Sequence, residues 1–297
     1  MEEKNRYLGS VRFYKNMLLL VIALLVLALT VVSMYYHHHY RQAAQLLEEE
    51  YHASIDSIMN ADSDPIPYQT LYEDFYAPQV YNATSRTAST AYLTFDGGPS
   101  DHTDELLALL AQAEVKATFF VSGNVDDDPQ YDEALRAIVA GGHTLGMGSW
   151  SNDYAVIYAS VESYLADMYA LYTYIQETTG VAPSVFRFAG GSINAYDAGI
   201  FRELIAEMIR RGFVPYDWNL SADGSAGSTQ LSAEELVLHV GDHLAGLDRA
   251  VVLLHDDDSH TTTMEALRGI IALLKERSFV LAPLTPDVKP VLFAYTD

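Results

Sequence analysis

Short apolar runs alternate with amphipathic runs over the last two thirds of the chain. The apolar runs have the length of strands and lie at residues 90–95, 115–121, 143–145, 185–188, 213–216, 250–255 and 279–281. Between them, apolar residues recur every three or four positions, which predicts helices near 103–112, 131–140, 160–179, 198–211, 232–246 and 262–277. Such alternation predicts an α/β domain with a parallel sheet. About seven strands in this length favour a distorted, TIM-like (β/α) barrel over a small open sheet.

One apolar run is much longer than the others. Residues 17–36 carry no charge, and about 20 helical residues are enough to cross a hydrocarbon core of about 30 Å. The apolar part of a cleaved signal peptide is usually about 7–15 residues long and ends at a site of small residues. This run is longer and leads into Tyr35, Tyr36 and three histidines. It therefore predicts a single transmembrane signal anchor.

The charges around this run predict its orientation. Four Lys and Arg residues lie within residues 1–16, and only Arg41 follows the run closely. Because positive charge stays on the cytoplasmic side, residues 1–16 are expected in the cytoplasm and the large domain outside the cell membrane.

The stretch between the anchor and the domain divides into two parts. Residues 37–59 have apolar positions at helical spacing and predict a helical stalk, although the stretch is short for a coiled coil. Residues 60–90 contain several Pro, Ser and Thr residues and predict a linker before a domain at 91–297.

Composition excludes several functions. The formal net charge is −23, which disfavours nucleic acid and other polyanions as partners. The chain has no cysteine, which excludes disulfides, thiolate nucleophiles and Cys-ligated metals. The oligomeric state stays open.

Polar residues stand where the predicted strands end. Asp96 ends the first run, Ser149–Asn152 follow the third, Arg187 lies in the fourth, Asp217 follows the fifth and His255 ends the sixth. In a parallel barrel these strand ends converge on the face that carries active sites. We therefore expect a shared polar site, although any one of these residues alone is more simply a strand-end residue.

Five ordered motifs resemble those of polysaccharide deacetylases, the NodB-homology group also called carbohydrate esterase family 4. They are TFDGGP at 94–99, GHTLGMGSWSN at 142–152, RFAGG at 187–191, DWN at 217–219 and LLHD at 253–256. The resemblance covers nearly all of residues 91–297. It implies a NodB-like barrel and removal of N- or O-acetyl groups from sugars.

The resemblance also implies roles for four residues. Asp96 matches the catalytic base and Arg187 the residue that orients it. His255 matches the general acid, and Asp217 the residue that orients His255. A carboxylate that accepts a proton and an imidazole that returns one are suited to hydrolysis of an acetyl group.

The positions that resemble the metal ligands carry other residues. Members of the family hold a divalent ion such as zinc with an Asp and two His, and Gly97, Gly148 and Asn152 stand at those positions. Glycine has no side-chain donor, and an amide is a weak ligand. The sequence therefore predicts no metal cofactor and a pseudoenzyme that binds cell-envelope glycan or an envelope protein. Trp150, Tyr154 and Trp218 are candidates for stacking on a sugar, although aromatics near a barrel rim more often have a packing role.

Two alternatives remain. The chain could be an active deacetylase with relocated ligands, drawn from His102, His143, His260 and the acidic run 256–258. It could instead be an envelope scaffold in which the stalk and the surface matter and the polar site does not.

Overall fold

The computed structural model describes residues 12–24, 26, 27, 30, 34, 68, 70–78, 88–123, 127–197, 199–222, 231–257 and 261–293. The chain forms two compact units, residues 1–56 and residues 57–297.

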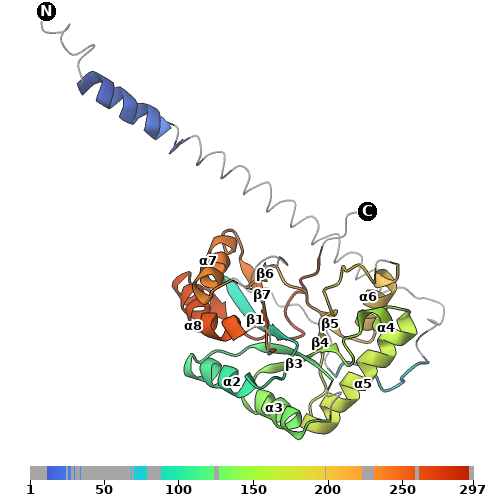
Figure 1. The fold of residues 1–297 in the computed structure, drawn as a ribbon. Helices are drawn as coiled ribbons and strands as arrows, with labels where there is room; N and C mark the ends of the chain where they lie inside the picture. Colours follow the sequence, from blue (N-terminus) through green and yellow to red (C-terminus); the bar gives the residue numbers. More distant parts are fainter. Residues whose placement is uncertain are drawn as a thin grey trace, which may run out of the picture. The chain divides into compact units, whose positions relative to one another are not determined.

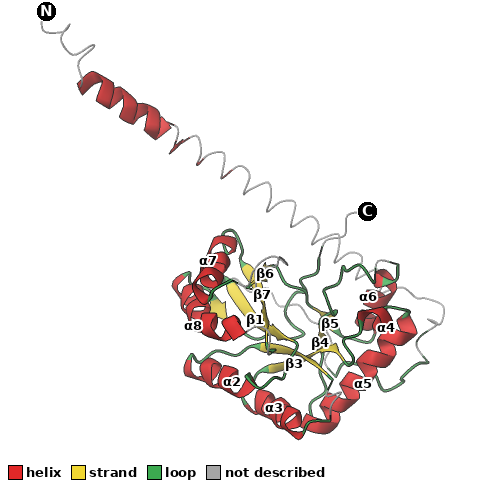
Figure 2. Cartoon of the chain, in the orientation of Figure 1, coloured by secondary structure: helices red, strands yellow, loops and turns green. Residues whose placement is uncertain are grey.

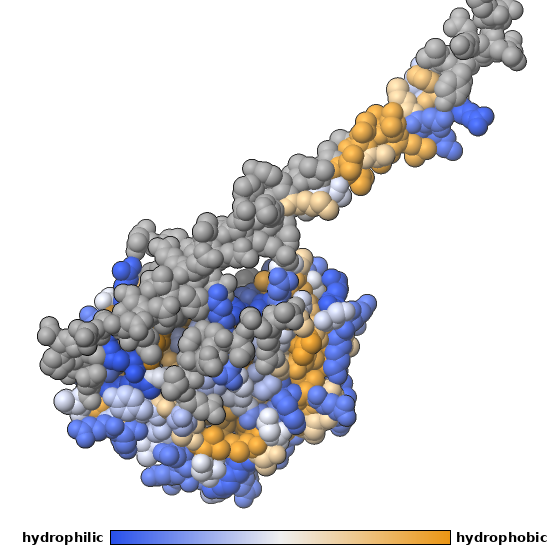
Figure 3. Space-filling view, turned by 180° about the vertical axis from the view of Figure 1, so that it is seen from behind, coloured by the Kyte–Doolittle hydropathy of each residue, from blue (hydrophilic) through white to orange (hydrophobic). Residues whose placement is uncertain are grey.

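The first unit contains a helix over residues 12–24, and the other described positions up to residue 34 are also helical. Its side chains are mostly apolar and exposed, and they form a continuous apolar band (Figure 3). No helix within the described residues is both long and apolar enough to span a membrane. The predicted span 17–36 runs on through undescribed positions, so the anchor stays a prediction. The predicted stalk at 37–59 lies outside the described residues.

The second unit is built on a parallel sheet (Figures 1 and 2). The strands are β1 (Thr90–Asp96), β2 (Thr118–Ser122), β3 (Thr144–Ser149), β4 (Val185–Phe186), β5 (Val214–Pro215), β6 (Leu220–Ser221), β7 (Arg249–His255) and β8 (Val280–Leu281). Their order is β5-β4-β3-β2-β1-β7-β6, and β8 pairs with β1. The seven strands of this path curl into a half-barrel. The α/β prediction is confirmed, but among the described residues β5 and β6 stand at opposite ends of the path, so the predicted barrel is open. Each of these end strands is only two residues long.

Helices follow most strands and lie on the outer side of the sheet (Figure 2). They are α2 (Thr103–Gln112), α3 (Pro129–Ala140), α4 (Tyr154–Ile157), α5 (Val161–Thr179), α6 (Phe201–Arg210), α7 (Ala233–His243) and α8 (Thr261–Glu276). The periodicity predicted six of them; α4 is a single turn and was not predicted. The helix boundaries have local causes, such as the capping box of Ser232 and Glu235 at the start of α7.

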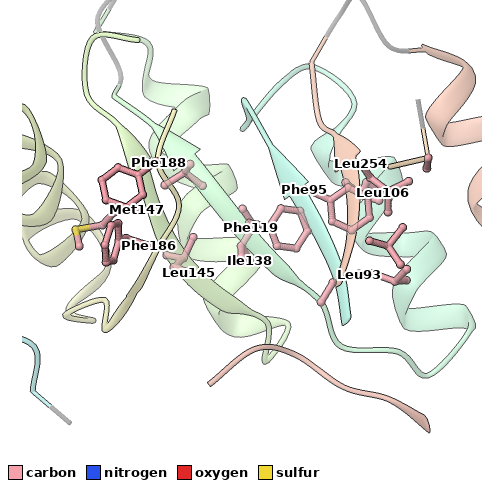
Figure 4. Close-up of a cluster of buried hydrophobic side chains, with 14 of the residues drawn as sticks. Leu93, Phe95, Leu106, Phe119, Ile138, Leu145, Met147, Phe186, Phe188 and Leu254 are labelled. Atoms are coloured by element: carbon pink, nitrogen blue, oxygen red, sulfur yellow. The ribbon is translucent and has the colours of Figure 1, made fainter. Parts of the chain in front are cut away.

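Both faces of the sheet are buried, which explains the nearly continuous apolar strands. Alternate residues of β1 divide between two clusters: Leu93 and Phe95 pack towards the helices, whereas Tyr92 belongs to a smaller cluster on the inner face. Figure 4 shows Leu93 and Phe95 beside Leu106 of α2 and Leu254 of β7.

The segment after β8 covers the inner face of the half-barrel. Leu284 and Val288 belong to the inner cluster, and the Tyr216 hydroxyl donates to the carbonyl oxygens of Thr285, at 2.9 Å, and Val288. Val291 forms an isolated parallel bridge with Tyr216. This segment therefore brings residues near the C-terminus to the ends of the central strands.

Part of the predicted linker is a packed element of this unit. Phe75 is fully buried, and the buried Arg211 guanidinium donates to the carbonyl oxygens of Tyr68, Leu71, Tyr72 and Phe75. Arg211 also pairs with Glu207, with 2.9 Å between Nε and Oε1. These contacts fasten residues 70–78 to α6.

Candidate functional site

The ion pair between Asp96 and Arg187 lies at the centre of the site. Asp96 is the last residue of β1, and Arg187 directly follows β4. Arg187 NH1 lies 2.6 Å from Asp96 Oδ1, and the two side chains are 1% and 24% exposed. The structure thus brings together two residues 91 positions apart in sequence, and one of them remains accessible to solvent.

Arg187 is held by more than this pair. Its guanidinium donates to the carbonyl oxygens of Tyr216 (2.8 Å) and Asp217 (3.1 Å) and to Thr94 Oγ1 (2.9 Å). The guanidinium carbon also lies 4.2 Å from the centre of the Phe120 ring. A charge this well satisfied can be buried without a large net cost, and it fixes the direction of the Asp96 carboxylate.

Asp217 is fully buried, and its carboxylate contacts are with residues that the sequence did not single out. It accepts hydrogen bonds from the Ser192 backbone N–H (2.9 Å), the Ser192 hydroxyl and the Phe293 backbone N–H (2.7 Å). Burial raises the pKa of Asp217, and these hydrogen bonds oppose the shift. Asp217 therefore ties the loop after Arg187 to the C-terminal segment.

His255 ends β7 and stands directly opposite Asp96 in the parallel register of β1 and β7. The side chain is half-buried. The base and acid candidates thus occupy neighbouring strand ends, as the barrel argument expects. The predicted orientation of His255 by Asp217 stays a prediction.

The three aromatic candidates have different surroundings. Tyr154 is half-buried, and burial together with the negative charge of Asp96 raises its pKa. A Cβ at Gly190 would lie 2.9 Å from the Tyr154 ring, so the ring lies against the glycine loop that follows Arg187. Tyr154 therefore lines one side of the site.

The two tryptophans divide between packing and the site. Trp150 contacts Tyr174 edge-on, with ring centres 5.3 Å apart, and lies against the backbone of Gly123, which is a packing role. Trp218 lies 5.5 Å from the Arg187 guanidinium and 4.8 Å from the Phe293 ring. Trp218 therefore belongs to the site, and the sequence alone could not separate it from Trp150.

The loop between β3 and α4 is held by Asp167 of α5, another residue that sequence reasoning missed. Its carboxylate accepts from Ser149 Oγ (2.8 Å), Trp150 N (2.7 Å), and Ser151 N (2.9 Å) and Oγ (2.7 Å). These bonds fix the chain up to Asn152, which has a left-handed backbone with φ of 54°. No sequence signal marks Asp167 beyond its polar position on a helix.

The positions that resemble the metal ligands do not supply a donor set that fits a divalent ion. Gly97 has φ of +92°, a conformation that side-chain-bearing residues rarely adopt. Gly148 is the extra residue where the pairing shifts from Val121–Met147 to Ser122–Ser149. A Cβ at Gly148 would lie 2.9 Å from the Val121 carbonyl oxygen, so the space for a side chain is closed. Only the amide of Asn152 remains, and it is a weak ligand.

The relocated ligands considered from sequence have other surroundings where they are described. His143 Nδ1 accepts from the Ala117 backbone N–H at 3.1 Å, and burial together with the charge of Lys116 lowers the pKa of His143 to about 4. Asp256 is buried and accepts from the hydroxyls of Ser100 and Thr103, both at 2.7 Å.

His102 precedes α2, whereas His260 and Asp258 lie outside the described residues. Within the described part of the chain, no three His, Asp or Glu side chains are grouped as a metal site.

Comparisons with known proteins extend the resemblance beyond the motifs. A family model described as polysaccharide deacetylase matches residues 83–208. A peptidoglycan-N-acetylglucosamine deacetylase of Bacillus cereus is 31% identical over 207 residues, which cover 68% of this chain and 71% of the relative.

Solved structures agree. The catalytic domain of a peptidoglycan N-acetylglucosamine deacetylase from Eubacterium rectale matches with a TM-score of 0.67 and 30% identity, covering 73% of this chain and 97% of that domain. A polysaccharide deacetylase from Bacillus cereus matches with a TM-score of 0.57 and 28% identity, covering 66% and 92%.

Proposed function

Because the chain belongs to the polysaccharide deacetylase family, we propose that it is a metal-free member that binds N-acetylated cell-envelope glycan without hydrolysing it. We propose further that residues 17–36 anchor it in the cell membrane with the large domain outside. The sugar class follows the relatives, whose names refer to peptidoglycan N-acetylglucosamine. A largely neutral sugar chain suits a protein of net charge −23 better than an anionic polymer.

One observation carries the loss of catalysis: the donor set at the positions of Gly97, Gly148 and Asn152. A bound divalent ion lowers the pKa of water from 15.7 to about 7 and polarises the carbonyl. General acid–base help from Asp96 and His255 would contribute only about 10²–10⁴-fold. An N-acetyl amide is too inert for that help alone to give useful turnover.

The glycan proposal is supported by the polar and aromatic groups that remain. Asp96 presents a partly exposed carboxylate in a fixed direction, as a hydrogen-bond acceptor for sugar hydroxyls. Tyr154 stands beside it, and Trp218 lies against Arg187. Aromatic rings beside oriented polar groups can bind the apolar face of a sugar.

The test uses the full chain in detergent and N-acetylglucosamine oligomers. We expect no acetyl release with or without added zinc, cobalt, nickel or manganese. Binding by calorimetry should be measurable, and Tyr154→Ala should weaken it. Tyr76→Ala is the matched control, because Tyr76 is an exposed tyrosine on the segment held by Arg211, and it should not change binding.

Each other outcome identifies an alternative. Acetyl release that depends on a metal would overturn the proposal in favour of an active deacetylase with relocated ligands. Absence of both binding and acetyl release would favour the scaffold. In that case deletion of residues 40–59 should abolish the cellular role, and Asp96→Ala with His255→Ala should not.

A further inference from the structure

We propose that α7 carries an exposed site for a divalent transition-metal ion, formed by His239 and His243. The two residues are four positions apart, which places them on the same face of the helix. Their ring centres are 4.2 Å apart, with an angle of 39° between the planes. Two histidines at this spacing on one helix can share one metal ion, as they do in zinc-dependent proteases.

A hydrogen bond prepares His243 for this role. Its Nδ1 lies 2.8 Å from the carbonyl oxygen of His239, one turn back. Because a carbonyl oxygen only accepts, Nδ1 carries the hydrogen of this bond, and Nε2 is the ring nitrogen left to bind a metal. Histidines that bind metals usually hold their other ring N–H in this way, because the bond fixes the tautomer and the ring orientation.

The charge around the pair also suits a cation. Asp242 is an exposed carboxylate that lies between the two histidines in the sequence, and the chain as a whole has a formal net charge of −23.

The helix that carries the pair is rigid at its start and packed along its length. Ser232 and Glu235 form a capping box, which engages the Glu235 carboxylate one turn before His239. Gly241 lies against Leu273 of α8, and Gly269 of α8 lies against Val237. The two imidazoles therefore start from a fixed backbone, which lowers the entropic cost of closing the chelate.

The site has two protein ligands, because no group of three metal-binding side chains occurs within the described residues. Water or a group from another molecule would complete the coordination. Imidazole ligands select copper, nickel and zinc over magnesium and calcium, and Cu²⁺ should bind most tightly. His239 and His243 lie on α7, outside the sheet, whereas Asp96 and Arg187 lie at the ends of β1 and β4 (Figure 2). Metal bound on α7 would therefore not restore deacetylation.

The test counts bound ions and is independent of activity. The full chain is stripped with chelator, incubated with Ni²⁺ or Zn²⁺, desalted and measured by mass spectrometry. All proteins carry His37→Gln, His38→Gln and His39→Gln, because three adjacent histidines would bind metal themselves. We expect about one ion per chain in this background, and none after the further change His243→Gln. His102→Gln, at the start of α2, is the control and should keep the ion.

A second measurement guards against loss of folding. His243 is exposed, so His243→Gln should melt at the same temperature as its parent without metal. Added Ni²⁺ should raise the melting temperature of the parent alone. An unchanged ion count after His243→Gln would overturn this proposal. Acetyl release by a protein that lacks the α7 histidines would overturn only the proposed function.

Discussion

The two sides of the polar site differ in how closely they match the family resemblance. On the Asp96 side, the residues that the family resemblance calls for are present, and Arg187 is satisfied by an ion pair and three further hydrogen bonds. On the Gly148 side, the corresponding side chains are absent, and the Val121 carbonyl oxygen of β2 lies 2.9 Å from the place where a Cβ would be.

The difference follows from burial. Removing one partner of a buried ion pair leaves an uncompensated charge and costs about 3–5 kcal/mol. A metal ligand would have no such structural anchor in a chain that binds no metal, because its side chain would then stabilise nothing. Asp96 and Arg187 can therefore persist for stability alone, and their presence is weak evidence for catalysis.

The largest effect is expected from Arg187→Met. The change removes the partner of Asp96 and leaves Thr94 Oγ1 and the carbonyl oxygens of Tyr216 and Asp217 without their guanidinium donor. We expect the free energy of unfolding to fall by about 3–5 kcal/mol. Chemical denaturation followed by circular dichroism measures it.

Arg136→Met is the matched control. Arg136 pairs with Asp132 at 3.5 Å, but the two side chains are 53% and 32% exposed. Such a pair contributes about 0–1 kcal/mol. Equal effects from the two substitutions would show that the Asp96 side is not held by its buried ion pair.

The sequence predicted this side of the site better than its surroundings. Asp96 and Arg187 could be placed together because both end parallel strands, and strand ends converge. Ser192 and Phe293 could not be connected with Asp217, since those bonds span 25 and 76 residues and two of the donors are backbone N–H groups. Backbone donors leave no mark in a sequence.

For the fold, the sequence predicted the long elements better than the short ones. Long elements such as α5 and β7 were predicted nearly to their ends, because α5 repeats its apolar spacing over several turns and β7 is a long continuous apolar run. The two residues of β6 and the single turn of α4 are too short to show a period. The barrel is open between the short end strands β5 and β6. Because β6 could not be predicted, the opening could not be predicted either.

A smaller effect is expected at Asp197, a buried carboxylate in the loop that follows Arg187. Asp197 is fully buried and accepts hydrogen bonds from the backbone N–H and the amide of Asn194. Burial, with a contribution from Asp217, raises the pKa of Asp197 to about 6. Its stabilising contribution is therefore complete below pH 3.8, the ordinary pKa of an aspartate, and is lost as pH rises to about 6.

Asp197→Asn removes this titration. Relative to the parent, the variant should gain stability between pH 4 and 6, by on the order of 3 kcal/mol, and keep that gain at pH 7. Denaturant unfolding at a series of pH values measures the difference. Asp101→Asn changes an exposed aspartate and is the control, because such a surface substitution should change the free energy of unfolding by no more than about 0.5 kcal/mol. If the difference in free energy of unfolding between Asp197→Asn and the parent did not change with pH, Asp197 would be ionised at little cost.

The smallest loss of stability is expected from a substitution on the Gly148 side. Gly148→Ala places a Cβ 2.9 Å from the Val121 carbonyl oxygen, so β2 or β3 must move. We expect a loss of about 1–3 kcal/mol, as for other overpacked positions. Gly199→Ala is the control, because a Cβ at Gly199 meets nothing within 4 Å and the change should be neutral or slightly stabilising. If Gly148→Ala were as harmless as Gly199→Ala, position 148 would still have room for a side chain. Gly148→His would then be a feasible step towards restoring a metal ligand, and the two sides of the site would differ only in residue identity.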